Sequence, residues 1–139
     1  MSCTFCDIVA GVVPSYQVYE DERTLVFLDY RPLLPGHCLV VPKTHYPVLE
    51  DLPAGEVGPY FQVVQRLATA VEQAFAAEGA FVAANIKISQ SVPHLHVHVV
   101  PRRKGDGLFS RTLVWKRSPY ASEDAIKEGQ ARIRQALRA

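Results

Sequence analysis

The sequence predicts an α+β fold in which an antiparallel five-stranded sheet packs against one long helix and a C-terminal helix. Five short apolar or alternating runs have the length of strands, and turn residues bound them. Residues 55–79 repeat apolar side chains at spacings of three and four, and this helical pattern lies between the third and fourth runs. Short connections elsewhere favour antiparallel neighbours, because parallel strands need long crossovers.

The first half of the chain predicts a hairpin and a third strand. A polar turn at residues 21–23 separates the alternating residues 16–20 from the apolar residues 24–29. Two prolines and a glycine make residues 31–36 a loop, because proline cannot donate to a sheet ladder. Residues 37–41 form the next predicted strand.

The second half supplies both helices and two further strands. The long helix stops at Gly79, a residue that commonly ends helices. Residues 81–86 and 94–100 are predicted strands. The last helix begins after Ser122, which can cap its first turn, and acidic residues follow directly.

Composition places the chain among folded globular proteins. Its 139 residues are 48% hydrophobic and 21% charged, with a net charge of +1, so we expect residues 1–139 to form a single domain. Disordered and fibrous classes are excluded. No apolar run approaches the roughly 18 residues of a membrane span, and the N-terminal residues lack a secretion signal. We therefore expect a cytoplasmic protein that binds neither membrane nor nucleic acid.

Charge is unevenly distributed along the chain. Residues 102–139 carry ten of the 15 Lys and Arg residues but only four of the 14 Asp and Glu residues. A solvated helix and loop explain this basic segment, and so does attraction of an anionic ligand. The sequence leaves both explanations open.

The three cysteines do not form a disulfide framework, because their number is odd and no secretion signal is evident. Cys3 and Cys6 form a CxxC motif, which fits half of a metal site or a redox pair. A redox pair of the thioredoxin type follows a buried strand, and only two residues precede Cys3, so the redox interpretation is disfavoured. Cys38 lies in an apolar strand, where we expect it to be buried.

Three of the five histidines lie within residues 94–98 and alternate with apolar residues. In a strand this alternation puts His94, His96 and His98 on one face and Leu95 and Val97 on the other. Two histidines at this spacing can both bind one zinc ion, and a third ligand from elsewhere in the chain would leave an open position for water. A neutral imidazole held by an acceptor can also act as a nucleophile. The row alone does not decide between these chemistries.

The surrounding residues resemble the histidine triad (HIT) family. Residues 90–102, QSVPHLHVHVVPR, resemble the family signature, in which histidines alternate with apolar residues after Gln-Ser or Gln-Thr. Further segments follow the family's order at nearly its spacings: Cys3–Ile8, Tyr19–Glu22, Phe27–Asp29 and Pro35–His45. The resemblance covers most of the chain. It is to the bacterial, Hint-like members that have an N-terminal CxxC motif, and it implies the HIT-like fold of those members.

The resemblance also implies an activity. Family members bind purine nucleotides and displace a group from the α-phosphate. By this resemblance His96 attacks phosphorus and forms a nucleotidyl-histidine intermediate, which water hydrolyses. His98 would contact the phosphate oxygens and assist proton transfer to the leaving group. His94 and His37 would fix the orientation of the rings, as a nucleophile requires.

Nucleotide-binding residues follow from the resemblance in the same way. Gln90 and Ser91 match contacts to the phosphate and the leaving group, Asp29 matches the acceptor of the ribose hydroxyls, and Asn85 matches a ribose or phosphate contact. The apolar base-pocket positions are Phe5, Ile8, Val13 and Phe27. The loop at residues 86–89 departs from the family because it is shorter and has no glycine.

In members with the CxxC motif the resemblance implies a zinc ion bound by Cys3, Cys6, His45 and His94. Two thiolates and two imidazoles complete a tetrahedral site, so the zinc would be structural. Family members pair their sheets, so we also expect a homodimer.

Two alternatives to this activity remain open, and so do two substrate classes within it. The protein could be a nucleotide-binding regulator with little turnover, or a hydrolase whose three histidines hold a catalytic zinc. Within the family, residues 101–107 resemble the fragile-histidine-triad branch, which cleaves dinucleoside polyphosphates. The CxxC motif and Ser91 are more like the Hint branch, which favours nucleoside phosphoramidates.

Overall fold

The computed structural model describes residues 2–109 and 115–138. In this part of the chain, three α-helices and a short 3-10 helix accompany a five-stranded sheet of order β1-β2-β3-β5-β4, in which every neighbouring pair is antiparallel. The elements in chain order are α1 (Thr4–Val9), β1 (Gln17–Glu20), β2 (Thr24–Leu28), β3 (Cys38–Pro42), η1 (Leu49–Asp51), α2 (Ala54–Ala74), β4 (Gly79–Ala83), β5 (Val97–Arg102) and α3 (Glu123–Arg138). The predicted α+β fold is confirmed.

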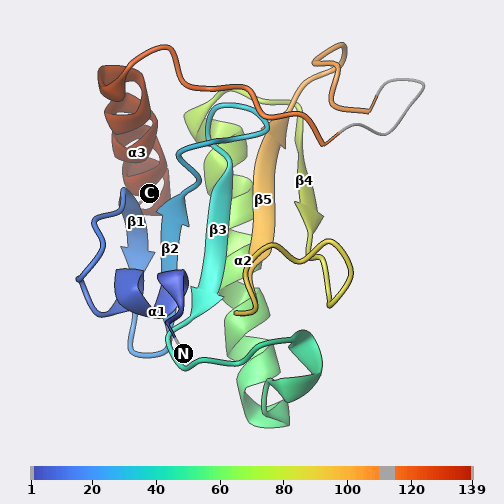
Figure 1. Ribbon diagram of the computed structural model, residues 1–139. Helices are drawn as coiled ribbons and strands as arrows, with labels where there is room; N and C mark the ends of the chain where they lie inside the picture. Colours follow the sequence, from blue (N-terminus) through green and yellow to red (C-terminus); the bar gives the residue numbers. More distant parts are fainter. Residues whose placement is uncertain (1, 110–114, 139) are drawn as a thin grey trace.

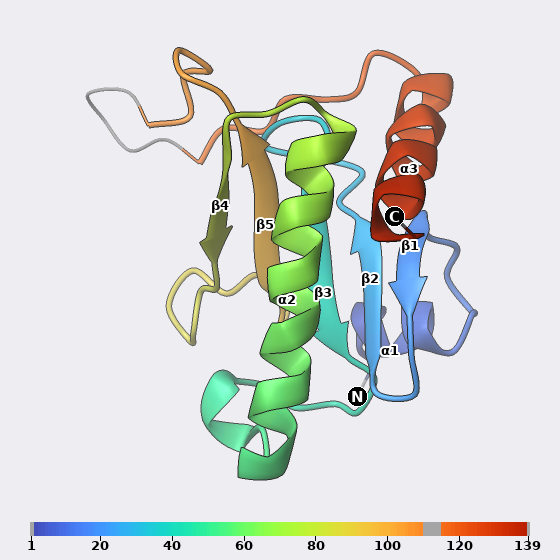
Figure 2. The same ribbon diagram turned by 180° about the vertical axis from the view of Figure 1, so that it is seen from behind.

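The two faces of the sheet are covered differently (Figures 1 and 2). Helices α2 and α3 lie side by side on one face, and the short helix α1 lies on the other near one end of β2. None of the helices in the described part of the chain has the length and apolarity of a membrane span.

Alternation along the strands separates two apolar clusters. The main core joins the sheet to α2 and α3 and contains Val26, Val40, Leu95, Val97 and Val99. The neighbouring residues of β2 and β3 point to the opposite face, where they pack against α1. This is the period-two pattern expected for a sheet that is covered on both sides.

Helix α2 forms where the sequence predicts it, and its apolar face packs on the sheet. Tyr60, Val64, Leu67 and Val71 are buried along it. The Tyr60 hydroxyl donates to the Val40 carbonyl at 2.7 Å, which ties the helix to the middle of β3. The buried hydroxyl therefore has a partner, as burial of a polar group requires.

The predicted boundaries need correction at several elements. Helix α2 ends at Ala74 rather than Gly79, because Ala76 takes a left-handed conformation with φ of 49° that stops the helix. Gly79 instead begins β4, which covers residues 79–83 rather than 81–86. Helix α3 begins after Ser122 as predicted, and the Ser122 hydroxyl accepts from the Ala125 amide at 3.1 Å.

The fifth strand begins at Val97, three residues later than the predicted range of 94–100. Its ladder with β3 begins at the pair Val40–Val97. Ahead of that pair the backbone turns to other partners, since the Leu95 amide donates to the Tyr46 carbonyl at 2.7 Å. His94 and His96 therefore lie in the segment that leads into β5, and only His98 lies on the strand.

Candidate active site and metal site

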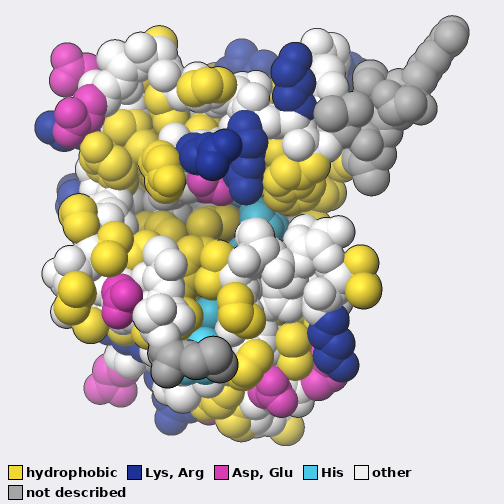
Figure 3. All heavy atoms as spheres, in the orientation of Figure 1, with side chains coloured by type: hydrophobic (Ala, Val, Ile, Leu, Met, Phe, Trp, Pro, Cys, Tyr) yellow, Lys and Arg dark blue, Asp and Glu magenta, His cyan; other side chains and the backbone are white. Residues whose placement is uncertain are grey.

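The imidazoles of His96 and His98 lie on the face of the sheet that carries α1. His98 is paired with Leu39, a member of the α1-side cluster, so its side chain points to that face. A cavity of about 430 Å³ opens beside the two rings. The residues that line it are Asn85, Ser89, Ser91, His96, His98, Trp115 and Arg117. Figure 3 shows histidine side chains in a hollow on this side of the molecule, with Lys and Arg side chains next to it.

One hydrogen bond fixes the protonation of His96. Its Nδ1 lies 2.8 Å from the carbonyl oxygen of His94. A carbonyl only accepts, so Nδ1 carries the proton and Nε2 keeps its lone pair. The Phe5 ring stands edge-on to this imidazole, with ring centroids 5.1 Å apart. Burial lowers the pKa of His96, which favours the neutral imidazole that a nucleophile needs.

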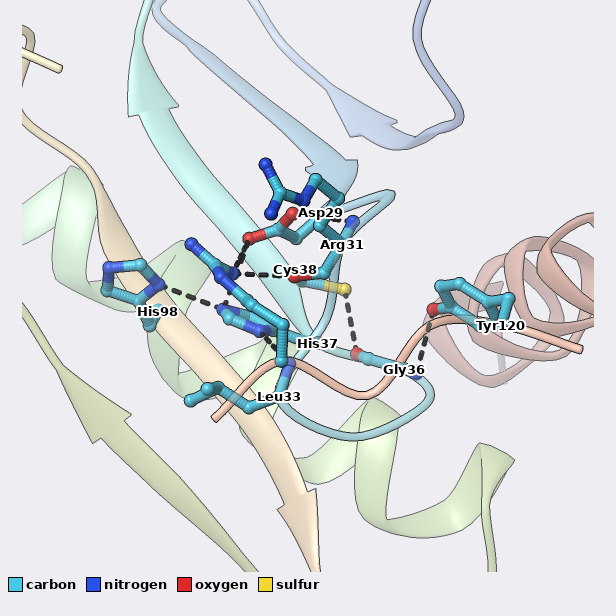
Figure 4. A network of polar contacts seen from close by, with 9 residues as sticks. Asp29, Arg31, Leu33, Gly36, His37, Cys38, His98 and Tyr120 are labelled. Atoms are coloured by element: carbon cyan, nitrogen blue, oxygen red, sulfur yellow. Dashed lines mark hydrogen bonds and ion pairs between the residues drawn. The ribbon is translucent and has the colours of Figure 1, made fainter. Parts of the chain in front are cut away.

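Two successive hydrogen bonds fix the opposite tautomer in His98 (Figure 4). The Leu33 amide donates to His37 Nδ1 at 3.0 Å, so the proton of neutral His37 is on Nε2. His37 Nε2 lies 2.8 Å from His98 Nδ1 and donates to it. The proton of His98 is therefore on Nε2. Burial lowers the pKa of both His37 and His98 to about 3, so neither ring is charged near neutral pH.

Asp29 follows directly after β2, beside His37. Its Oδ1 accepts from the Arg31 amide at 2.9 Å, and its Oδ2 accepts from the Arg117 guanidinium at 2.7 Å. Oδ2 also lies 3.9 Å from His37 Nε2. Asp29, the predicted acceptor of the ribose hydroxyls, thus lies close to the histidines, and both of its carboxylate oxygens accept hydrogen bonds from the protein.

The predicted phosphate contacts divide into two groups. Asn85 and Ser91 line the cavity with His96 and His98. Gln90 does not line it, because its amide nitrogen donates to the Pro47 carbonyl at 2.7 Å and its Oε1 accepts from the Lys87 amide at 2.8 Å. In this structure the Gln90 side chain holds the loop together.

The glycine-free loop contains two residues with left-handed backbone. Lys87 has φ of 69° and Ser89 has φ of 59°. Such a conformation costs roughly 1 kcal/mol for a residue other than glycine. The two residues thus adopt a shape that glycine would adopt without strain, and Ser89 is one of the residues that line the cavity.

The four predicted base-pocket residues lie together in the apolar cluster between α1 and the sheet. Phe5, Ile8 and Phe27 are buried in one cluster, and half-buried Val13 packs against it. The Phe5 and Phe27 rings meet edge to face, with centroids 5.5 Å apart. Because Phe5 also contacts His96, this apolar surface begins beside the candidate nucleophile.

The four predicted metal ligands converge on one point. Cys3 Sγ lies 3.4 Å from His94 Nδ1, Cys6 Sγ lies 3.3 Å from His45 Nδ1, and the two imidazole Nδ1 atoms lie 3.2 Å apart. All four atoms lie within 4.8 Å of one another. Tetrahedral zinc with bonds of about 2.0–2.3 Å separates its ligand atoms by about 3.3–3.8 Å, so the donor set fits zinc.

The tautomer of His94 agrees with a metal site. His94 Nε2 lies 2.8 Å from the Pro42 carbonyl and donates to it, which leaves an unprotonated Nδ1 facing the two sulfurs. Burial and the neighbouring Cys3 raise the pKa of Cys6 to about 11, so a bound cation must displace that proton. His96 and His98 are not members of this cluster.

Sequence reasoning did not identify Arg117 or Ser89 as site residues. Arg117 stands 88 positions from its partner Asp29 and belongs to no periodic pattern. The one available signal is the excess of basic residues after position 101. Trp115 packs edge-on against His98, with ring centroids 4.9 Å apart.

Comparison with known proteins agrees with this geometry. A model of the HIT domain matches residues 10–105. The chain is 41% identical over 128 residues to Protein hit from Bacillus subtilis (strain 168), covering 88% of this chain and 86% of that protein. It is 32% identical over 125 residues to Adenylylsulfatase HINT3 from Arabidopsis thaliana, covering 88% of this chain and 64% of that protein.

A solved structure matches nearly the whole chain. The crystal structure of a Zn-bound histidine triad family protein from Mycobacterium smegmatis superimposes with a TM-score of 0.84 at 41% identity, covering 99% of this chain and 94% of that one. The fold, the spacing of His94, His96 and His98, and the Cys and His cluster agree with these matches. The chain therefore belongs to the histidine triad (HIT) family.

Proposed function

We propose that the protein is a hydrolase and nucleotidyl transferase that cleaves purine nucleotide derivatives at the α-phosphate through a nucleotidyl-His96 intermediate. One observation carries the proposal: two neutral imidazoles of opposite tautomer border the same cavity. His96 keeps a lone pair on Nε2, and His98 keeps a proton on Nε2. A nucleophile and a hydrogen-bond donor for the leaving group are thus held side by side.

The chemistry follows from these two nitrogens. His96 Nε2 attacks the α-phosphorus, a P–N bond forms, and the bond between phosphorus and the leaving group breaks. The Nε2–H group of His98 donates a hydrogen bond to the departing atom, which takes its proton from a water molecule. A second water molecule then attacks phosphorus and gives its proton to the hydroxide left by the first, which breaks the P–N bond and releases the nucleoside monophosphate.

Substrate contacts complete the proposal. The apolar cluster around Phe5 and Phe27 suits the base, and Asp29 suits the ribose hydroxyls. Asn85 and Ser91 border the cavity, where they can donate hydrogen bonds to phosphate oxygens. The similarity to a protein named adenylylsulfatase supports cleavage beside an adenylyl group.

Zinc is proposed as a structural ion held by Cys3, Cys6, His45 and His94. When bound, it cross-links four residues and supplies no open coordination position for chemistry. His94 connects this site to catalysis, because its carbonyl oxygen accepts the Nδ1 proton of His96. Similarity to a Zn-bound family member supports the assignment.

A homodimer is proposed as the working form. β4 is an edge strand of the sheet, and Val82 on it is 45% exposed. An unpaired edge strand is a template for a second sheet. Light scattering during size-exclusion chromatography tests this, and a monomer mass at all micromolar concentrations would contradict it.

Steady-state kinetics test the activity. The substrates are adenosine 5′-phosphoramidate, a lysine-linked AMP and diadenosine tetraphosphate, and the comparison is wild type with His96→Ala. The proposal predicts release of AMP by wild type and loss of at least about a thousandfold in kcat for the variant. Activity that survives in His96→Ala would contradict the role of His96 as nucleophile, and a wild type that binds nucleotides without turnover would favour the regulatory alternative.

A further inference from the structure

We propose that Arg117 binds the anionic leaving group of the substrate, so that the site favours nucleotide derivatives with a phosphate or sulfate leaving group over those with an amine. This inference rests on the proposed function, because it names the substrate class for the same cavity. Three observations support it: how the guanidinium is held, which of its edges has no hydrogen-bond partner among the described residues, and the cavity that it shares with His98.

The Arg117 guanidinium is held at one nitrogen. Its NH1 donates to Asp29 Oδ2 and to the Arg31 carbonyl, both at 2.7 Å. These two bonds use both protons of NH1. Within residues 2–109 and 115–138, Nε and NH2 of Arg117 have no hydrogen-bond partner. The edge formed by Nε and NH2 is the one that binds phosphate and sulfate in a bidentate manner.

The arginine shares one cavity with the two imidazoles that act on the phosphate and the leaving group. Arg117 lines the cavity with His96 and His98, and its charge contributes to lowering the pKa of both rings. The other side chains among the described cavity residues are neutral amide, hydroxyl, imidazole and indole groups. His98 is the hydrogen-bond donor for the leaving group, and Arg117, which is paired with Asp29, is the one charged side chain among the described residues that line the cavity beside it.

The backbone around Arg117 is anchored, which limits how far the guanidinium can move. The Ser118 amide donates to the Pro32 carbonyl at 2.7 Å. Trp115 packs against His98, and the Arg117 guanidinium lies 5.9 Å from the Trp115 ring centroid. A cation fixed in advance on a rigid support stabilises developing negative charge without reorganisation.

Two substrates that share the adenylyl group test the inference. Adenosine 5′-phosphosulfate releases sulfate, and adenosine 5′-phosphoramidate releases ammonia. The measured quantity is the ratio of their kcat/KM values in wild type, Arg117→Gln and Arg117→Ala. We expect the ratio of phosphosulfate to phosphoramidate to fall roughly 10- to 100-fold in both variants, which corresponds to loss of one charge-assisted contact.

Lys116→Gln is the matched control, because it removes the same charge from an exposed neighbour. Its ratio should equal that of wild type. Arg117→Gln keeps an N–H donor for Asp29 without the charge, so it separates loss of charge from loss of the anchor. Diadenosine tetraphosphate in a parallel assay shows whether a polyphosphate leaving group behaves like sulfate.

Two outcomes would overturn the inference. An unchanged ratio, with both kcat/KM values reduced equally, would mean that Arg117 acts on the α-phosphate or only supports the fold. Unchanged values for both substrates would mean that it makes no contact. Failure of the proposed function is distinguishable, since it shows in wild type and in His96→Ala and not in the ratio.

Discussion

His37 Nε2 and His98 Nδ1 lie 2.8 Å apart in a fully buried contact. His37 Nδ1 accepts a hydrogen bond from the Leu33 amide. The donor and the acceptor of each hydrogen bond from Leu33 through His37 to His98 are therefore fixed. The Nε2 proton that His98 presents to the cavity is therefore set by a residue 61 positions earlier in the sequence. His94 has a parallel role for His96, through its backbone carbonyl.

Removing the His37 ring should impair hydrogen bonding from His98 to the leaving group. In His37→Ala the Nδ1 atom of His98 loses its donor, so the ring can change tautomer or rotate. We expect kcat for an amine leaving group to fall by at least about tenfold. His37→Gln restores an amide N–H near the same position and should recover part of the rate. Equal kcat values in wild type and His37→Ala would contradict this role.

The same pair predicts how stability depends on pH. The folded pKa of His37 and His98 is about 3, below the value of 6.5 that each has when exposed. Between these values the unfolded chain binds protons that the folded chain does not, so stability is fully present above about pH 6.5 and falls as the pH drops. The slope is at most about 1.4 kcal/mol per pH unit for each group.

Urea unfolding at pH 7.5 and pH 5.5 measures this loss. Wild type should lose about 1–3 kcal/mol between the two conditions. The His37→Asn variant lacks one of the two buried imidazoles, so its loss should be smaller. A loss of the same size in wild type and variant would show that these rings do not control the acid sensitivity.

Zinc should be present at one ion per chain and should stabilise the N-terminal helix α1. Cys6→Ser removes one thiolate, so we expect loss of zinc and a lower Tm, because the metal joins α1 to His94. Cys38→Ala is the control. Cys38 is buried outside the metal cluster, so this variant should keep its zinc. Elemental analysis of the purified proteins checks this, and a wild-type content well below one would refute the site.

Gly36 should not accept a larger residue. Its φ is +92°, and a Cβ atom at this position would lie 2.6 Å from the Phe75 ring. Gly36→Ala should destabilise the protein by about 2–4 kcal/mol through backbone strain and overpacking. Because His37 follows directly, its contact with His98 should loosen as well.

Gly55→Ala is the matched control for Gly36→Ala. Gly55 lies in the first turn of α2, and a Cβ atom there meets nothing within 4 Å. Alanine favours the helix, so this variant should be more stable by about 0.5–1 kcal/mol. Urea unfolding of both variants tests the pair, and a Gly36→Ala protein as stable as wild type would show that the close approach to Phe75 is not limiting.

Local patterns account for the parts of the structure that the sequence predicted. Strand alternation and helical periodicity are properties of neighbouring residues, so the sheet, α2 and α3 could be predicted with errors at their ends. Helix α1 was not predicted, because six residues carry too little periodicity to be recognised. The segment holding His94 looks like a strand, but its backbone bonds with Tyr46 instead of β3.

Long-range contacts explain the rest. The cavity position of Arg117 depends on Asp29 and Arg31, and no local pattern encodes that meeting. The Gln90 side chain is similar, since its hydrogen bonds to Pro47 and Lys87 depend on how two loops meet. The metal ligands were assigned through the family resemblance, because positions 3, 6, 45 and 94 share no spacing that elementary geometry would recognise.

Direct capture of the covalent intermediate tests the central claim. Wild-type protein is mixed with adenosine 5′-phosphoramidate and denatured in alkali within the first turnover, because P–N bonds to histidine are labile in acid. Peptide mass spectrometry then locates the adduct. The account predicts one adenylyl group on the peptide that contains His96, and none in His96→Ala. AMP formation without an adduct, or an adduct on another residue, would contradict it.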